Sequence, residues 1–384
     1  MGQGTPIQWA DDTANPSMGC TVACELCPTP KLLSGIAVEF FQCQFPGSDE
    51  KVVSDAVQEE LRDRNSSEIA QLYRETSEKV TSVVAANPVS GGVGRMAVGY
   101  ETVLKQHMLC YAHQLHIRYS GDVARPTKKV NIGYAPQFEK VTKFPGRMAA
   151  AAGWPDLFGM IRKGKPWLDF LPRIIFVSDM GDALSPEVDF EYLEAEIIGN
   201  VTGAAGLRHL WLWLTKHPNR MAEFGRWMSE RGRGWPDNLV AMTTVTGPAT
   251  EWRAEALQKV PARFKGLSVE PLWARVELPL AGVDLCIVGG QSGDVAKPFD
   301  LAWALDLKSQ CETTGSSFFL KQLGSNAWWN GQRLHLRHGH GGDWIEWPPE
   351  FRVRRMPAGF YAYRCEKLWP DSPPLDPQQT SLLP

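Results

Sequence analysis

Short apolar runs alternate with longer amphipathic segments over most of the chain. Eight runs have the length and the β-branched or aromatic content of buried strands. They lie at residues 6–9, 130–134, 173–177, 209–213, 238–242, 265–269, 284–288 and 317–320. Helix-like segments separate the later runs, which is the order of parallel βα units. We therefore predict an α/β fold, a parallel (β/α) barrel that is complete or nearly complete with eight units.

The pattern changes between the first two runs. Residues 28–44 hold an apolar stretch that predicts the helix following the first strand. Charged residues at helical spacing then occupy 51–64 and 68–79, and a further helix-like segment covers 96–117. We predict a mainly helical insertion over residues 47–121.

These patterns divide the chain into five parts. Residues 1–46 form the first βα unit with a cysteine-rich loop, 47–121 the insertion and 122–325 the remainder of the barrel. Residues 326–370 form a basic and aromatic extension, and the proline-rich residues 371–384 a disordered tail.

Composition narrows the class of protein. The 384 residues are 43% hydrophobic, which is enough to bury a barrel-sized core. The formal net charge is -3, so contact with nucleic acid would need a local basic patch. No secretory signal and no run of 18 apolar residues is present. We expect a soluble cytoplasmic protein that does not enter a membrane.

Polar residues follow nearly every predicted strand. The carboxyl ends of parallel strands meet at one edge of a barrel, where catalytic residues of such folds lie. The residues at these positions are Ser178, Asp179 and Asp182; Thr215 and Lys216; Thr243 and Thr244; Glu270; Gly289, Gly290, Gln291 and Ser292; and Lys321 with Gln322. Any βα protein has some polar residues there, because the strand has left the core. Glu270 and Lys321 differ in directly following apolar runs.

Three of the eight cysteines, Cys20, Cys24 and Cys27, lie within eight residues in a C-x3-C-x2-C spacing. Three such thiolates can hold three corners of a [4Fe–4S] cluster and leave one iron without a protein ligand. A structural zinc site normally needs a fourth ligand or a second C-x2-C pair, and the other cysteines stand alone. The spacing favours a cluster over zinc and over chance.

C-x3-C-x2-C is the signature of the radical SAM superfamily, which this segment resembles closely, with Leu26 where members usually carry an aromatic residue. The resemblance implies that the open iron binds S-adenosylmethionine. It also implies that the reduced cluster cleaves this cofactor to a 5′-deoxyadenosyl radical, which abstracts a hydrogen atom from the substrate. An external electron donor such as flavodoxin is then needed.

The same resemblance gives the strand-end residues expected roles. Thr215, Thr244 and Glu270 are candidates for the cofactor's ribose, and Lys216 and Lys321 for a carboxylate. The candidate cofactor-binding set is Ser178, Asp179, Thr215, Thr244, Glu270, Gly289, Gly290 and Gln291, where the glycines allow close backbone approach. The candidate catalytic residues are Lys216, Glu270 and Lys321.

Six motifs in order resemble a phage-associated three-cysteine-motif family of the radical SAM type, largely of unknown function. They are Trp9 to Asp12 with Asn15, Pro16, Gly19 and Cys20; Phe176 to Asp182; Leu214 to Lys216 with Asn219 to Met221; Leu267 to Leu272; Ile287 to Gly290 with Ser292 and Gly293; and Phe318 to Gln322. The compact cysteine spacing and the insertion depart from that family's pattern. The resemblance implies an isomerase acting on an amino-acid-modified thymidine in phage DNA, in the cytoplasm of the host.

Two basic stretches with interleaved aromatic residues are candidates for contact with nucleic acid. The first holds Lys128, Lys129, Lys143, Arg147, Arg162, Lys163 and Lys165 with Trp167, and the second holds Arg333, Arg337, Arg352, Arg354 and Arg355. His335, His338 and His340 lie in a glycine-rich turn without a cysteine or carboxylate framework, so a metal site there is not favoured.

Two other functions stay open. One is a metal-stabilised module that binds DNA or a protein without turnover. The other is a radical SAM lyase that repairs damaged DNA, for which Cys110 or Cys286 would be candidate hydrogen donors.

Overall fold

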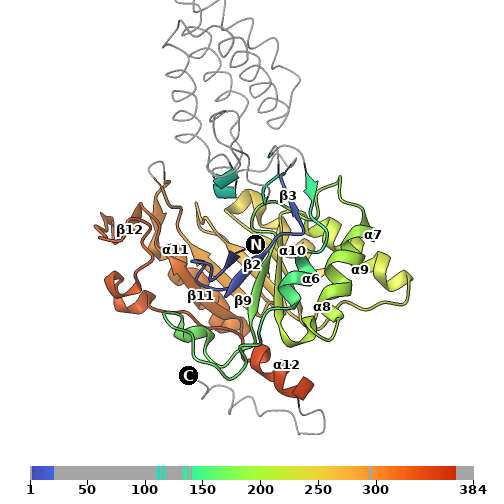
Figure 1. Ribbon diagram of the computed structural model, residues 1–384. Helices are drawn as coiled ribbons and strands as arrows, with labels where there is room; N and C mark the ends of the chain where they lie inside the picture. The colour runs from blue at the N-terminus through green and yellow to red at the C-terminus, as the bar shows by residue number, and fades with distance from the viewer. Residues whose placement is uncertain are drawn as a thin grey trace, which may run out of the picture. The chain divides into compact units, whose positions relative to one another are not determined.

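The computed structural model describes residues 2–20, 110–112, 115–116, 133–135, 138, 141–293 and 296–368. The chain divides into two compact units, residues 1–16 with 144–384, and residues 17–143. The first unit carries the main sheet (Figure 1). Within the described residues, the second unit includes the short antiparallel pair β3 (Ser17–Met18) and β4 (Thr142–Lys143).

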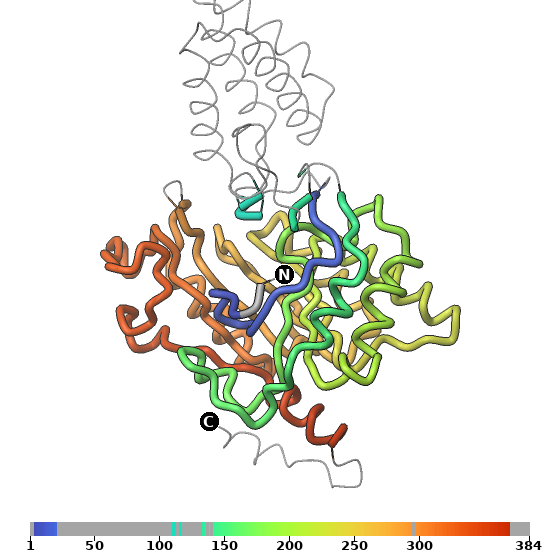
Figure 2. The backbone as a smooth tube through the Cα atoms, in the orientation of Figure 1, coloured from blue at the N-terminus to red at the C-terminus, as the bar shows by residue number. Residues whose placement is uncertain are grey.

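The main sheet is curved and mostly parallel. Its strand order is β1-β2-β5-β6-β7-β8-β9-β11. The bounds are β1 Gly2–Gln3, β2 Asp12–Ala14, β5 Ile174–Val177, β6 Leu210–Thr215, β7 Leu239–Thr244, β8 Lys265–Val269, β9 Leu285–Gly289 and β11 Ser317–Gln322. β1 pairs antiparallel with β2, and the other seven strands run parallel to form a half-barrel (Figure 2).

The prediction of a parallel α/β fold is confirmed at the level of this half-barrel. Six predicted strands lie where the apolar runs placed them, as β5 to β9 and β11. The predicted first strand was wrong, because residues 6–9 form a turn and the strand is β2. In the run predicted at 130–134, Gly133 and Tyr134 form a turn, and 130–132 lie outside the described residues.

Helices and short turns connect the strands. The helices are α6 Arg147–Ala152, α7 Phe190–Leu193, a π-helical turn Glu194–Ile198, α8 Gly199–Thr202, α9 Pro218–Glu230, α10 Trp252–Gln258, α11 Leu301–Thr314 and α12 Ala358–Leu368. A small sheet of β10 (Phe299–Asp300), β12 (Ala327–Trp329) and β13 (Gln332–Arg333) lies beside α11. Helices α10 and α11 contact the strands directly. In the part of the chain that is described, every helix is too short or too polar to cross a membrane.

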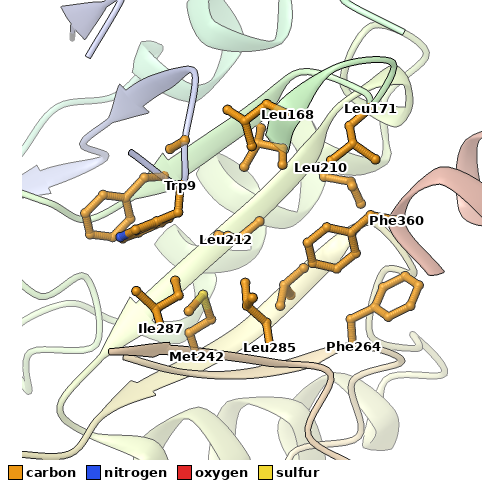
Figure 3. Packing of buried hydrophobic residues seen from close by; sticks show 14 of the residues in the cluster. Trp9, Leu168, Leu171, Leu210, Leu212, Met242, Phe264, Leu285, Ile287 and Phe360 are labelled. Atoms are coloured by element: carbon orange, nitrogen blue, oxygen red, sulfur yellow. The ribbon is translucent and has the colours of Figure 1, made fainter. Parts of the chain in front are cut away.

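The inner face of the half-barrel holds the main apolar cluster. Alternate residues of each strand point to the same face. Phe176, Leu212, Met242, Ile287 and Phe319 therefore face the same side and belong to one cluster with other buried residues. Leu212, Met242 and Ile287 are labelled in Figure 3. Each large apolar side chain buried in this way contributes about 1.5–3 kcal/mol.

The amino-terminal end of the half-barrel is plugged by α12. Phe360 and Tyr363 of this helix belong to the cluster, where Phe360 packs edge-on to Phe264 at 5.3 Å between ring centroids. Leu210 and Leu285, the first residues of β6 and β9, belong to the same cluster (Figure 3). The polar strand ends consequently lie at the opposite end of the sheet.

Residues after the small sheet cover the outer edge of β11. The Leu320 N–H donates to Val353 O at 2.8 Å, the Arg355 N–H donates to Phe318 O at 3.1 Å, and Phe319 and Arg354 form an antiparallel bridge. These bonds satisfy backbone groups that an open sheet edge would leave unpaired.

Arg354 connects this edge with the chain that precedes β2. Its guanidinium donates to the carbonyl oxygens of Leu320, Lys321 and Gly342 and to Gln8 Oε1. It lies over the rings of Trp167, Trp344 and Trp347, at 4.3, 5.4 and 5.0 Å from their centroids. Burial lowers the pKa of Arg354 to about 10, so the group stays charged at neutral pH.

The other side of this connection is made by the segment 162–173. Lys165 Nζ donates to the carbonyl oxygens of Thr5, Ile7 and Ala10 at 2.8, 2.7 and 2.5 Å. Two buried ion pairs, Arg162 with Asp11 and Arg173 with Asp12, fix the start of β2 to β5. Asp11 and Asp12 look like turn formers in the sequence, but their carboxylates are neutralised here, which explains why the first strand was misplaced.

These contacts correct the expectation of two basic surface patches. Arg162 is buried and also donates to three backbone carbonyls, and Lys165 binds the carbonyls before β2. Arg354 lies among aromatic rings. Of the first stretch, Lys128 and Lys129 lie outside the described residues. Arg162, Lys165 and Arg354 thus bind backbone carbonyls of the fold.

We predict that Arg354→Met lowers the free energy of unfolding by about 3 kcal/mol, because carbonyl oxygens at the edge of β11 lose a charged donor. Arg337→Met is the matched control: Arg337 is 91% exposed and pairs with Glu346 at 3.2 Å, so its loss should cost less than about 1 kcal/mol. Urea unfolding followed by tryptophan fluorescence measures both. Equal losses would contradict a structural role for Arg354.

We also predict a pH dependence from His209, whose ring is buried beside Ala152 O at 3.1 Å. Burial lowers the pKa of His209 to about 4 from an ordinary value of 6.5. Between these pH values the unfolded chain binds a proton that the folded chain does not, so acidification favours unfolding by up to about 1.4 kcal/mol per pH unit. His209→Gln should show a shallower loss of stability from pH 6.5 to 4 than the wild type. If the stability of both proteins fell equally between pH 6.5 and 4, the burial of a neutral His209 would not be the cause of the pH dependence.

Candidate functional site

Strand register brings predicted site residues from several strands to the inner face at the carboxyl edge. Thr244 after Met242 and Gly289 after Ile287 continue the inward-facing series of β7 and β9. Ser178, Lys216 and Glu270 directly follow the ends of β5, β6 and β8, and Lys321 lies near the end of β11. The same alternation directs Thr215 and Thr243 to the opposite face.

Glu270 and Lys321 form an ion pair on this inner face. Lys321 Nζ lies 3.1 Å from Glu270 Oε1, and the two side chains are 24% and 12% exposed. The geometry of this contact is not that of a hydrogen bond. Glu270 Oε1 is buried and has no hydrogen-bond partner among the described residues. The pair is therefore electrostatically satisfied but retains unused hydrogen-bonding capacity.

A β-bulge aims Lys321 at this position. Leu320 pairs with Val288 and Gln322 pairs with Gly289, so Lys321 is an extra residue in β11. A bulge places two residues opposite one and redirects a side chain. Gln322 Nε2 consequently donates to Gly290 O at 3.0 Å and to Ser292 Oγ at 2.8 Å.

The two adjacent glycines are used for contacts within the protein. A Cβ atom on Gly289 would lie 2.6 Å from Glu270 Oε1, so a larger residue there would require the carboxylate to shift. A Cβ atom on Gly290 would collide with the backbone of Leu323. Gln291 Oε1 accepts from Trp273 Nε1 at 3.0 Å and from the Lys297 N–H at 3.3 Å. The close approach predicted from these glycines exists, and it is made by protein atoms.

Asp182 organises the loop after β5. Its carboxylate accepts from Thr215 Oγ1 at 2.9 Å, from the Lys216 N–H at 2.8 Å and from the Leu184 N–H at 3.0 Å. The Thr215 hydroxyl, predicted to bind a ribose, thus donates to a buried carboxylate and fixes the turn that carries Lys216.

Asp179 and Ser178 form a second polar group beside β2. Asn15 Nδ2 donates to Asp179 Oδ1, and Asn15 Oδ1 accepts from the Met180 N–H at 2.9 Å. Burial raises the pKa of the Asp179 carboxyl, against the lowering effect of the Asn15 hydrogen bond. Ser178 has a left-handed backbone with φ of 74°, and its buried Oγ has no hydrogen-bond partner within the described residues. Such a backbone conformation in a residue other than glycine often accompanies a functional site.

Thr244 lies on the inner face but is buried, and its carbonyl accepts from Arg253 Nη1 at 3.2 Å. Other predicted residues lie apart from the inner face. Cys286 is fully buried on the outward face of β9, where a hydrogen bond to Cys311 and burial raise its thiol pKa. That position does not suit the role of a hydrogen donor at the inner face. His338 Nδ1 accepts from the Gly342 N–H at 3.1 Å in an exposed turn.

The predicted cluster ligands are only partly described. Cys20 is half-buried, and its N–H donates to Phe138 O at 2.7 Å within the second unit. Cys24 and Cys27 lie outside the described residues. The described residues contain no group of three or more His, Cys, Asp or Glu side chains that could hold a metal ion.

Asn15 and Gln322 were not among the candidate catalytic or cofactor-binding residues, although Gln322 was noted at a strand end. Asn15 joins β2 to the loop after β5, and Gln322 joins the ends of β9 and β11. Both belong to motifs noted in the sequence: Asn15 directly follows β2, and Gln322 is the last residue of β11. Their partners depend on which strands are neighbours, which a single sequence does not state.

The fold and site define an α/β protein with an open parallel half-barrel and a polar, charged site at its carboxyl edge. Residues 96–348 match the family described as "Protein of unknown function (DUF5131)", and the chain belongs to that family. The match begins after the three cysteines. No curated protein matches the chain. No solved structure matches it either.

We predict that Gly290→Ala lowers stability by about 1–3 kcal/mol through overpacking, because its Cβ atom would lie 2.3 Å from Leu323 O. Gly234→Ala is the control, because a Cβ atom at Gly234 meets nothing within 4 Å. Thermal unfolding of both variants measures the difference. A Gly290→Ala protein as stable as the control would show that the backbone of Leu323 does not confine this position.

Proposed function

We propose that this protein is a radical SAM enzyme. Cys20, Cys24 and Cys27 would hold a [4Fe–4S] cluster, and the inner carboxyl edge of the half-barrel would hold S-adenosylmethionine and substrate. The observation that carries the proposal is the C-x3-C-x2-C segment, which begins six residues after the end of β2, beyond the short strand β3. β2 is the first parallel strand of a half-barrel whose other strands end in polar residues.

The donor set fits the cluster chemically. Three thiolates from one short segment supply three ligands and leave one iron for the cofactor. When bound and reduced, the cluster supplies homolytic cleavage of the sulfonium of S-adenosylmethionine.

The chain's own residues would bind and orient the reacting molecules. Glu270 and Lys321 offer opposite charges on one inner face, and Lys216 lies on the turn after β6 that Asp182 fixes. The Ser178 hydroxyl supplies a further unused hydrogen-bonding group nearby in the same series of strand ends. The apolar cluster beneath these residues excludes water from the floor of the site.

We also propose, as the substrate, an amino-acid-modified thymidine in DNA, rearranged by an isomerase reaction. What supports this is the presence of both an acidic and a basic group at the edge, which suits a substrate bearing an amine and a carboxylate. Arg162, Lys165 and Arg354 bind protein groups and lend the DNA component no support.

Anaerobic reconstitution tests the proposed chemistry. The wild type should bind about four irons and form 5′-deoxyadenosine when reduced with S-adenosylmethionine, and its reduced-cluster EPR signal should change on adding the cofactor. Cys24→Ala should lose the cluster and the product. Cys365→Ala, at a half-buried position on α12, should retain both.

Two results would contradict the proposal. One is a reduced, iron-loaded protein that forms no 5′-deoxyadenosine. The other is zinc in place of iron with a fourth protein ligand, which would instead favour a metal-stabilised binding module.

A further inference from the structure

We propose that the Glu270–Lys321 pair binds the α-amino-acid group of a ligand, with the ligand's ammonium at Glu270 and its carboxylate at Lys321. The inference rests on the proposed function, because it names the chemical group that this same site recognises. It is carried by the charges, burial and unused hydrogen-bonding capacity of the two side chains.

The first step concerns which atoms stay available. Glu270 Oε1 is buried against Gly289 and faces Lys321, so a ligand donor has to approach Oε2. A carboxylate has about four acceptor sites and an ammonium three donors. Among the described residues, the Lys321 ammonium meets only Glu270 within ion-pair distance, and no side-chain hydrogen bond of either group accompanies it. Both partners therefore have capacity left for a ligand.

The second step concerns charge. The pair is neutral overall and only 12% and 24% exposed, so adding a single charge beside it would be costly. A simple anion would pair with Lys321 but meet repulsion from Glu270, and a simple cation would meet the reverse. A zwitterion adds no net charge and places each of its groups opposite a partner. Charge complementarity thus selects an α-amino-acid group over a carboxylate or an amine alone.

The third step concerns rigidity. The bulge in β11 and the Arg354 guanidinium on Lys321 O at 2.7 Å fix the backbone of Lys321. Gly289 leaves the space in which the Glu270 carboxylate sits. Because both charges are held before a ligand arrives, little ordering is needed on binding.

Three probes with the same thioether side chain test the inference on the full chain. They are L-methionine, its analogue without the amino group, 4-(methylthio)butanoate, and its analogue without the carboxylate, 3-(methylthio)propylamine. Competitive saturation-transfer NMR compares their affinities. The wild type should prefer L-methionine about tenfold or more over each analogue, as expected from the loss of one charged hydrogen-bonded contact.

Variants then assign the preference to the pair. Glu270→Gln and Lys321→Met should abolish it, and Lys321→Arg should retain part of it. Lys308→Met is the control, because it breaks a surface pair of the same type, Lys308 with Glu312 at 3.4 Å, and should bind like the wild type. Thermal unfolding confirms that each variant is folded. A wild type without preference for L-methionine, or folded Glu270→Gln and Lys321→Met proteins that keep it, would overturn the inference.

EPR on the reconstituted protein distinguishes whether the bound amino-acid group belongs to the substrate or to S-adenosylmethionine. If S-adenosylmethionine still changes the cluster signal of Glu270→Gln, the group belongs to the substrate, and if that change is lost, it belongs to the cofactor. Failure of the proposed function is distinguishable from failure of this inference, because the NMR preference requires no iron. If the protein prefers L-methionine but forms no 5′-deoxyadenosine, the amino-acid site is supported and the radical SAM proposal is contradicted.

Discussion

The half-barrel depends on how its open side is closed. A parallel sheet that does not close on itself leaves backbone donors and acceptors along its outer strands. Here residues 353–355 pair with β11, and Arg354 and Lys165 bind carbonyls on the two sides of the opening. Aromatic rings shield the arginine. Cations that a sequence presents as a surface patch thereby replace the missing strand-to-strand pairing.

The same closure shapes the site. Arg354 holds the carbonyl of Lys321, whose side chain meets Glu270, and the Glu270 carboxylate occupies the space beside Gly289. On the other side of the sheet, Asn15, Asp179 and Asp182 connect the ends of β2, β5 and β6. Asn15, Asp179 and Asp182 are thus engaged with other protein groups, whereas Glu270 and Lys321 pair with each other and retain unused hydrogen-bonding capacity.

Much of the fold was predictable from apolar runs, because β5 to β9 and β11 are buried on both faces and need continuous hydrophobic stretches. β2 was not, since its polar Asp12 is buried with its carboxylate paired to Arg173, 161 residues away. The inner-edge positions of Glu270 and Lys321 followed from the barrel prediction. Their direct pairing did not, because it requires a bulge in β11 and a glycine in β9. Gly290 signals a close backbone approach, but its partner, Leu323, is not visible in the sequence.

The central claim is that the three cysteines serve a cluster with one iron left open to a ligand. The most direct measurement is the anomalous diffraction of an anaerobically reconstituted crystal, collected at the iron and zinc absorption edges. The account predicts a four-iron cluster held by Cys20, Cys24 and Cys27, with one iron lacking a protein ligand. Zinc bound by four protein ligands at these cysteines, or no metal at them, would contradict it.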